Sequence, residues 1–383
     1  MKKRHVFFYK LFYPLVALFL KIKFNYRFAV AKNPPEPYIV LSNHNTDYDM
    51  LLVGVSFPKQ MYFVASEHIL RWKRAARFLR YAFAPIARYK GSNAASTVME
   101  VIRRIRAGKN VCVFAEGNRS WDGVTNPILP STGKMVKSAR CALVTYRIEG
   151  GYFTSPNWSE KNTRRGRLYG APVNVYTKEQ LAGMSADEIN GAIARDLHED
   201  AYARQLASPA RYKGKNLAER FENLLFICPE CGAHDSIRSC GDKVRCEKCK
   251  MELRYTEYGM LEGTRFKTVK ELADWQKDEV KNTVLRGDTR YTAREAQLIS
   301  IARHEETPVD EGELFMDAQK LVCGRTAIPL EQISDIAMHG RQTIVFTTPD
   351  NYYELSVPRG SNMLKFLLLF EAIRKEQAQN MNM

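Results

Sequence analysis

Short apolar runs alternate with longer amphipathic stretches through the first 215 residues of the chain. Short apolar runs bounded by turn-forming residues are typical of buried strands, and longer amphipathic stretches are typical of helices. Strands are predicted at 38–41, 61–65, 108–114 (a turn, then a strand) and 142–148. Helices are predicted from residue 50 and at 67–83, 93–107 and 184–205. This alternation predicts an α/β fold for residues 36–215, with a mostly β sheet flanked by helices.

The first of these strands ends in a polar segment that contains a histidine and two aspartates. A polar segment between an apolar run and a helix start is typical of a tight turn. His44 and Asp49 would flank this turn, and a carboxylate that fixes the tautomer of a histidine allows the ring to act as a general base. Asp47 is an alternative partner, and a histidine near an aspartate is more often part of an ordinary surface turn. From spacing alone, the pair is a hypothesis.

Two segments together resemble the signature boxes of the glycerophospholipid acyltransferases, the family of the 1-acyl-sn-glycerol-3-phosphate (lysophosphatidate) acyltransferases. Asn43-His44-x4-Asp49 resembles the NHX4D box, and the later segment Val113-Phe-Ala-Glu-Gly-Asn-Arg-Ser120 resembles the FPEGTRS box. The chain departs from the second box at Ala115, where the family has proline, and at Asn118, where it has threonine. The resemblance implies an acyltransferase domain at 36–215.

The resemblance also implies roles for individual residues. His44 would be the catalytic base, and the family spacing favours Asp49 over Asp47 as its partner. The substrate-binding residues would be Arg88, Lys90, Glu116, Gly117, Asn118 and Arg119. Of the two basic candidates before the second box, Arg88 is the better match, because a guanidinium can form two parallel hydrogen bonds to a phosphate. A structural ion pair at the strand end is the alternative role for Glu116 and Arg119.

The reaction implied is transfer of a fatty acyl group from acyl-CoA or acyl carrier protein to a lysophospholipid hydroxyl. The expected acceptor is 1-acyl-sn-glycerol-3-phosphate, and another lysophospholipid or a glycolipid is the alternative. A non-catalytic scaffold that binds membrane, nucleic acid or protein is the rival from another class. A scaffold has no need of a His44–Asp49 pair, which favours the enzyme.

Charge is distributed very unevenly along the chain. The net charge is +16, yet residues 1–150 hold 25 Lys or Arg against 8 Asp or Glu, and the remainder is close to neutral. A basic region of this kind indicates an anionic partner. Together with the lipid acceptor, it favours an anionic membrane surface, and no nucleic acid is expected.

Residues 1–35 carry eight basic residues and no acidic one, around an apolar aromatic run at 6–20. No small-residue cleavage site follows this run, as a signal peptide would require. The run is short for a transmembrane helix and contains Lys10 and Pro14. An interfacial helix at the cytoplasmic face of a membrane is therefore expected, peripheral or monotopic, as against a buried helix of a soluble core. The basic helix at 67–83, with Trp72, is a second candidate membrane contact or a solvated face.

The chain has eight cysteines, and four of them form two C-x2-C knuckles. This spacing is typical of a zinc ribbon, in which four thiolates hold Zn²⁺ as a structural ion, and it predicts such a ribbon at 222–257. The ligands would be Cys228, Cys231, Cys246 and Cys249. His234 and Cys240 lie between the knuckles and are expected to be bystanders.

The last part of the chain is predicted to be a helical connector at 258–305 and a small β domain at 306–383. Short strands from residue 313 onward are followed by an amphipathic helix at 361–376. This order resembles a pleckstrin-homology-like (PH-like) or GRAM-like β-barrel domain, a type of module that binds lipids or proteins.

Overall fold

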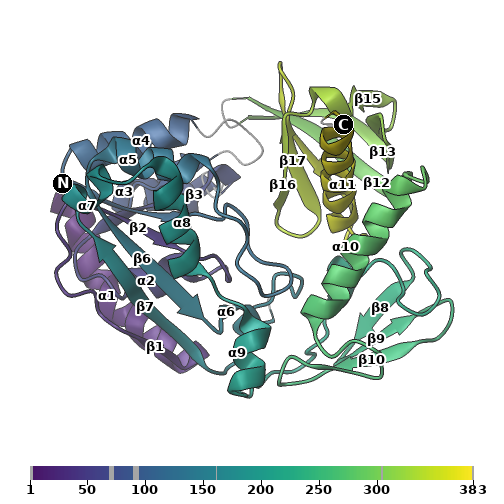
Figure 1. The fold of residues 1–383 in the computed structure, drawn as a ribbon, viewed down its shortest axis with the longest axis horizontal. Coiled ribbons are helices and arrows are strands. Elements are labelled where there is room, and N and C mark those ends of the chain that lie inside the picture. The colour runs from purple at the N-terminus through teal and green to yellow at the C-terminus, as the bar shows by residue number, and fades with distance from the viewer. Residues whose placement is uncertain (1–2, 69–72, 89–94, 161, 303–304, 382–383) are drawn as a thin grey trace. The chain divides into compact units, whose positions relative to one another are not determined.

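The computed structural model describes residues 3–68, 73–88, 95–160, 162–302 and 305–381 (Figure 1). These residues form two compact units. The N-terminal unit contains the described residues up to 157 together with 163–214. The C-terminal unit contains 158–160, 162 and the described residues from 215 onward.

A seven-stranded sheet forms the centre of the N-terminal unit, in the order β1-β7-β6-β2-β5-β3-β4. Its strands are β1 (Tyr26–Phe28), β2 (Tyr38–Ser42), β3 (Met61–Ser66), β4 (Ile86–Arg88), β5 (Asn110–Phe114), β6 (Ala142–Glu149) and β7 (Leu168–Tyr176). Neighbouring strands are parallel except for β6 and β7. The predicted α/β fold is confirmed.

Helices surround this sheet (Figure 1). They are α1 (Lys3–Phe24), α2 (Asp49–Gly54), α3 (Lys73–Ala82), α4 (Ala95–Arg106), α5 (Ser131–Ala139), α6 (Gly151–Thr154), α7 (Lys178–Ala182), α8 (Ala186–Leu197) and α9 (Ala201–Ala207). Helix α3 lies within the helix predicted at 67–83, and the short strand β4 that follows it was not predicted. The predicted membrane contact at Trp72 lies outside the described residues.

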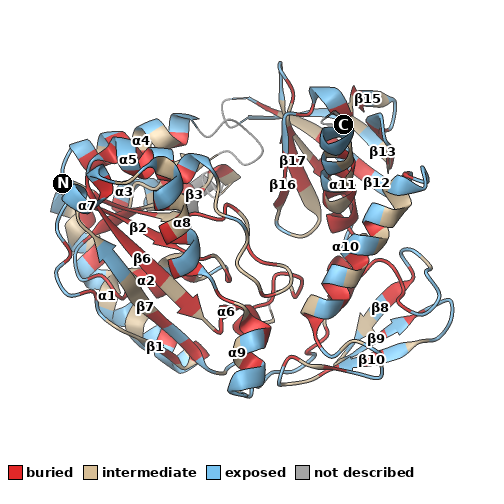
Figure 2. Ribbon diagram, in the orientation of Figure 1, coloured by how far each residue is buried: buried red, intermediate tan, exposed pale blue. Residues whose placement is uncertain are grey.

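The sheet is buried on both faces, as the red central strands in Figure 2 show. Side chains alternate along β2, so that Ile39 and Leu41 belong to one apolar cluster and Val40 belongs to the other. Helices α4, α5 and α8 contribute to the first cluster, and α1 and α2 to the second. Burial on both faces explains why the parallel strands appear in the sequence as continuous apolar runs.

Strands β2 and β5 are neighbours and run parallel, with Ser42 opposite Phe114. The carboxyl ends of these two strands therefore lie at the same edge of the sheet. The polar segments that follow them, at 43–49 and 115–120, leave the sheet side by side. This topology brings the two sequence boxes together.

The single helix predicted at 184–205 is wrong, because the chain forms two helices, α8 and α9, with a break at His198–Asp200. The Asp200 carboxylate accepts hydrogen bonds from the main-chain N–H groups of Tyr202 and Ala203 and so caps α9. Glu199, at the break, is buried. A charged residue hidden in this way gives no signal in an amphipathic pattern.

The C-terminal unit begins with a small four-stranded sheet in the order β11-β10-β9-β8. Its strands are β8 (Ile237–Cys240), β9 (Lys243–Cys246), β10 (Glu252–Tyr255) and β11 (Leu261–Glu262), and helix α10 (Val269–Leu285) follows. Gln276 of α10 is buried. Its side-chain oxygen accepts the N–H groups of Phe226 and Ile227, just before the first knuckle.

A second seven-stranded sheet, ordered β15-β14-β13-β12-β18-β17-β16, and a C-terminal helix complete this unit. The elements are β12 (Tyr291–Ala302), β13 (Glu305–Met316), β14 (Lys320–Cys323), β15 (Thr326–Pro329), β16 (Asp335–His339), β17 (Thr343–Thr347), β18 (Tyr352–Ser356) and α11 (Leu364–Met381). Strand β12 lies in the segment predicted as a helical connector, so that part of the prediction is wrong. The register shifts between Ala293 and Ala296, which interrupts the alternation expected of a strand.

Candidate active site

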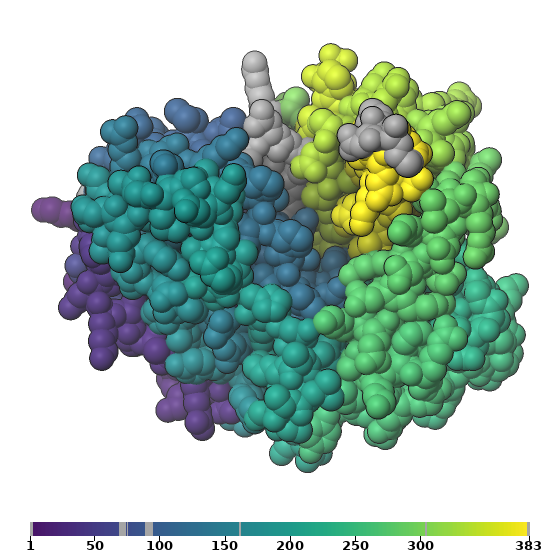
Figure 3. All heavy atoms as spheres, in the orientation of Figure 1, coloured from purple at the N-terminus to yellow at the C-terminus, as the bar shows by residue number. Residues whose placement is uncertain are grey.

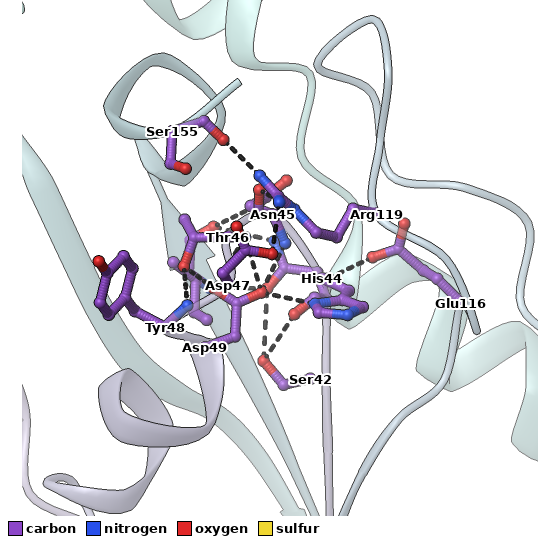
Figure 4. A network of polar contacts seen from close by, with 12 residues as sticks. Ser42, His44, Asn45, Thr46, Asp47, Tyr48, Asp49, Glu116, Arg119 and Ser155 are labelled. Atoms are coloured by element: carbon purple, nitrogen blue, oxygen red, sulfur yellow. Dashed lines mark hydrogen bonds and ion pairs between the residues drawn. The ribbon is translucent and has the colours of Figure 1, made fainter. Parts of the chain in front are cut away.

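The turn between β2 and α2 holds His44 and Asp49 in direct contact (Figure 4). The distance from His44 Nδ1 to Asp49 Oδ2 is 2.8 Å. This bond is consistent with the tautomer that carries its proton on Nδ1, which leaves Nε2 as the basic nitrogen of the ring. The His44 side chain is 23% exposed and its ring stacks on Phe114, with 4.7 Å between ring centroids.

Asp49 is buried and its carboxylate is fully engaged by the turn itself. It accepts the main-chain N–H of Asn45 at 2.6 Å and that of Thr46 at 3.0 Å. The hydroxyl of Thr46 donates to the other oxygen at 2.6 Å. These bonds fix the direction of the carboxylate toward His44.

Asp47, the alternative partner, contacts a different residue. Its carboxylate is 63% exposed and accepts a hydrogen bond from Arg119 Nη1 at 2.7 Å. Of the two aspartates left open by the residue pattern, the structure therefore pairs Asp49 with His44.

Glu116 connects the second box to the first. Its Oε1 accepts the main-chain N–H of His44 at 2.6 Å, and its Oε2 accepts the main-chain N–H of Asn126 at 2.6 Å. Burial raises the pKa of Glu116 to about 8, although the two N–H donors act in the opposite direction. The carboxyl group therefore holds the backbone of the turn that carries His44.

Arg88 and Gly117 lie against each other at the edge of the sheet. Gly117 has φ +77°, and a methyl group added at its Cα would lie 2.9 Å from Nη2 of Arg88. The positive φ favours glycine here, and a side chain at this position would displace the Arg88 guanidinium. Lys90, the competitor of Arg88, lies outside the described residues.

Arg119 lies within the protein, and its guanidinium contacts two segments, the turn at 43–49 and the residue that follows α6 (Figure 4). Besides Asp47, it donates from Nε to the main-chain oxygen of Asn45 at 3.0 Å and from Nη2 to that of Ser155 at 2.6 Å. Asn118 contributes its main-chain oxygen, which accepts the Asn126 side chain at 3.1 Å. Arg119 thus braces the turn that carries His44, in line with the structural ion pair given above as its alternative role.

Asn43, quoted from the first box but given no role by the sequence, is fully buried. Its side-chain amide donates to the main-chain oxygen of Ile148 at 2.9 Å and accepts the N–H of the same residue at 2.8 Å. It therefore ties the end of β2 to β6. Asn126 was also missed, since its contribution to Glu116 comes from the main chain.

An apolar cavity of about 310 Å³ opens beside α2, the helix that starts at Asp49. Met50 and Leu51 line it, together with residues of α1, β3 and α3 such as Phe12, Phe63 and Phe78. Its lining is almost wholly apolar, as a hydrocarbon chain requires.

The four knuckle cysteines come together in the C-terminal unit, and their sulfur atoms all lie within 4.8 Å of one another. Two of the Sγ–Sγ distances are 3.6 Å (Cys228–Cys249) and 3.8 Å (Cys231–Cys246). A tetrahedral ion with bonds of about 2.3 Å has edges of about 3.8 Å, so four thiolates at these positions fit Zn²⁺. Neither His234 nor Cys240 belongs to this cluster among the described residues.

Comparison with known proteins gives a family match and three similar chains among solved structures. Residues 25–149 match the model of the Acyltransferase family, which supports an acyltransferase-type domain in this part of the chain. A crystal structure of the 1-acyl-sn-glycerophosphate acyltransferase PlsC from Thermotoga maritima is 17% identical, with a TM-score of 0.40, over 54% of this chain and 79% of that chain. The N-terminal PH domain of human ARAP2 is 12% identical, with a TM-score of 0.18, over 23% of this chain and 82% of that chain. No curated protein matches the chain.

Proposed function

We propose that this protein is an O-acyltransferase that moves a fatty acyl group from acyl-CoA or acyl carrier protein to a lysophospholipid hydroxyl. The proposed acceptor is 1-acyl-sn-glycerol-3-phosphate. The observation that carries the proposal is the His44–Asp49 pair, 2.8 Å apart, inside the segment that matches the Acyltransferase family.

In the proposed reaction, Nε2 of His44 takes the proton of the acceptor hydroxyl as the hydroxyl oxygen attacks the thioester carbon. Asp49 holds the ring and stabilises the imidazolium that forms. The carbon–sulfur bond then breaks, and the departing thiolate recovers the proton from the imidazolium. No acyl-enzyme is needed, because both substrates are held together.

Arg88 is proposed as the phosphate-binding residue, and Lys90, two residues later in the sequence, is the second candidate. Arg88 is half-buried, and its guanidinium lies over the Gly117 turn, whose preceding residue holds His44. A phosphate bound there would set the distance between the acceptor's headgroup and the base. Glu116 and Arg119 would act on the acceptor indirectly, since both hold the turn, while Gly117 and Asn118 would form the floor of the site.

Helix α1 supports binding at an anionic membrane surface, which we place at the cytoplasmic face. It is long and apolar enough to cross a membrane by length and composition, and its purple atoms lie on the outside of the N-terminal unit (Figure 3). Large apolar side chains are exposed along it at Phe7, Leu11, Leu15, Leu18 and Ile22. Basic residues at both ends of the helix suit anionic headgroups.

The apolar cavity beside α2 is proposed to take a hydrocarbon chain of one substrate. Residues of α1 form one wall of it, so a lipid could enter from the membrane-facing side. The four cysteines are proposed to hold a structural Zn²⁺ that stabilises the C-terminal unit, with no part in the transfer. The β domain of that unit is proposed to be PH-like.

A matrix of donors and acceptors tests the function. Purified protein is incubated with acyl-CoA or acyl carrier protein thioesters and with lysophospholipid or glycolipid acceptors, and labelled product is measured. Transfer to 1-acyl-sn-glycerol-3-phosphate above the other acceptors supports the proposal. Transfer to a different acceptor corrects the substrate, and no transfer with any pair leaves the scaffold alternative.

A further inference from the structure

Glu199 lies at the break between α8 and α9, outside the segment that matches the Acyltransferase family. We propose that Glu199 is a positioning residue that holds the His44–Asp49 pair in its reactive geometry through Asn45 and Thr125. The expected effect of Glu199 on catalysis rests on the proposed function. Its effect on the hydrogen bonds of Asn45 and Asp49 can be measured whether or not the protein transfers acyl groups.

The Glu199 side chain is 5% exposed and connects three segments. Its Oε1 accepts the main-chain N–H of Gly150 at 3.1 Å and is paired with Arg204 Nη2 at 2.8 Å. Its Oε2 accepts the side-chain amide of Asn45 at 3.3 Å. Burial raises the pKa of Glu199, and the guanidinium of Arg204 opposes this effect.

Asn45 carries the first connection to the catalytic pair. Its main-chain N–H donates at 2.6 Å to Oδ2 of Asp49, the same oxygen that contacts His44 Nδ1 at 2.8 Å. Its side-chain amide also donates to the main-chain oxygen of Ile148, at 3.3 Å. Glu199 therefore supplies one of two acceptors of the Asn45 side-chain amide, beside the main-chain contacts of Asn45 with Asp49 and Arg119.

The second connection runs through main-chain atoms to the other box. The N–H of Glu199 donates to Thr125 Oγ1 at 2.8 Å, and the N–H of Thr125 donates to the oxygen of Glu199 at 2.9 Å. The next residue, Asn126, donates its N–H to Glu116, which in turn accepts the N–H of His44. Glu199 is thus linked to the Asn45 side chain directly and to the His44 backbone through Thr125, Asn126 and Glu116.

A substitution to glutamine separates these two connections. Glu199→Gln keeps the shape of the side chain and the two hydrogen bonds that the main chain of Glu199 forms with Thr125. Its amide cannot accept from Arg204, Gly150 and Asn45 together, because one carboxylate oxygen becomes a donor. The expected result is a folded protein in which Asn45, and with it Asp49, is less firmly held.

The matched control is Asp196→Asn, a buried carboxylate on α8 three residues earlier. Asp196 also accepts several hydrogen bonds, but they come from Thr145, Asn174 and Tyr176 on β6 and β7. A general loss of stability would affect both variants, whereas loss of positioning would affect Glu199→Gln alone.

Two measurements on the full chain test the proposal. Hydrogen exchange of the Asn45 and Thr46 amides, both of which donate to Asp49, should accelerate about tenfold in Glu199→Gln and stay unchanged in Asp196→Asn. The kcat for acyl transfer should fall about tenfold or more in Glu199→Gln, with the KM for the acyl donor unchanged. If Glu199→Gln does not fold, the double variant Glu199→Gln/Arg204→Gln removes the buried charge pair and is used instead.

Unchanged exchange in Glu199→Gln, or equal acceleration in both variants, would overturn the proposal. Accelerated exchange in Glu199→Gln alone, in a protein that transfers no acyl group, would uphold the coupling and refute the proposed function. The two failures are therefore distinguishable.

Discussion

The main-chain N–H of His44 donates a hydrogen bond of 2.6 Å to the buried carboxyl group of Glu116. The two residues belong to different boxes of the sequence and follow the neighbouring parallel strands β2 and β5. The candidate base is therefore held from both sides, by Asp49 at its ring and by Glu116 at its backbone.

The burial of Glu116 predicts a pH-dependent stability. Because burial raises the pKa of Glu116 from its usual 4.5 to about 8, the folded protein keeps this proton at pH values where the unfolded chain has lost it. The stabilising contribution is complete below pH 4.5 and is lost as the pH rises toward 8, by up to about 1.4 kcal/mol per pH unit. Glu116→Gln should lack this dependence.

Hydrogen exchange of the slowest β5 amides, measured at several values between pH 5 and 8, gives the free energy of opening for both proteins. The wild-type protein should lose stability relative to Glu116→Gln across this range. A difference between the two that stays constant with pH would contradict the raised pKa.

The two aspartates of the turn should differ strongly in their effect on catalysis. Asp49→Asn removes the charge that stabilises the imidazolium and should lower kcat by about 10²- to 10⁴-fold. Asp47→Asn weakens an exposed ion pair with Arg119 and should change kcat by less than about tenfold. Steady-state kinetics of both variants check this; equal losses would mean that the pairing seen in the structure does not govern the reaction.

Exposed leucines of α1 should contribute directly to membrane binding. Leu11→Gln combined with Leu15→Gln should weaken binding to anionic phospholipid vesicles more than tenfold, because each buried leucine contributes about 1.5–3 kcal/mol. The control is Leu206→Gln, which changes an equally exposed leucine of α9. Vesicle sedimentation measures the binding, and an unchanged bound fraction in the double variant would argue against α1 as the membrane contact.

The four-cysteine cluster should hold about one zinc ion per chain. Cys246→Ser should abolish zinc retention and lower the melting temperature of the C-terminal unit, since a structural zinc site contributes directly to folding. Cys240→Ser, an exposed cysteine of the same small sheet outside the cluster, is the control and should retain both properties. Elemental analysis measures the zinc content, and calorimetry measures the melting temperature. Zinc-free wild-type protein that melts at the same temperature as the zinc-loaded protein would refute the prediction.

The parts of the site that follow from side-chain chemistry and strand order could be predicted from the sequence. Polar segments after two buried strands, with His44, Asp49 and Glu116 in them, are visible because each strand is an apolar run buried on both faces. The structure brings these residues together because parallel neighbours end at one edge of the sheet.

The bracing of the site could not be predicted in the same way. Two of the three Arg119 contacts are main-chain oxygens, and Glu116 accepts two main-chain N–H groups. Main-chain partners leave no trace in residue types. Glu199 could not be identified because it lies in a break between two helices that the amphipathic pattern extends across. Strand β12 could not be predicted because its register shifts between Ala293 and Ala296.

The central claim is that His44 is the base of an acyl transfer, and the most direct measurement is the rate of transfer by His44→Ala with the best donor and acceptor of the matrix. Its fold is checked by hydrogen exchange of β2 and β5. The account predicts a loss of about 10³-fold or more in kcat, with the acyl-donor KM little changed. A folded His44→Ala protein that retains transfer within about tenfold of wild type would contradict it.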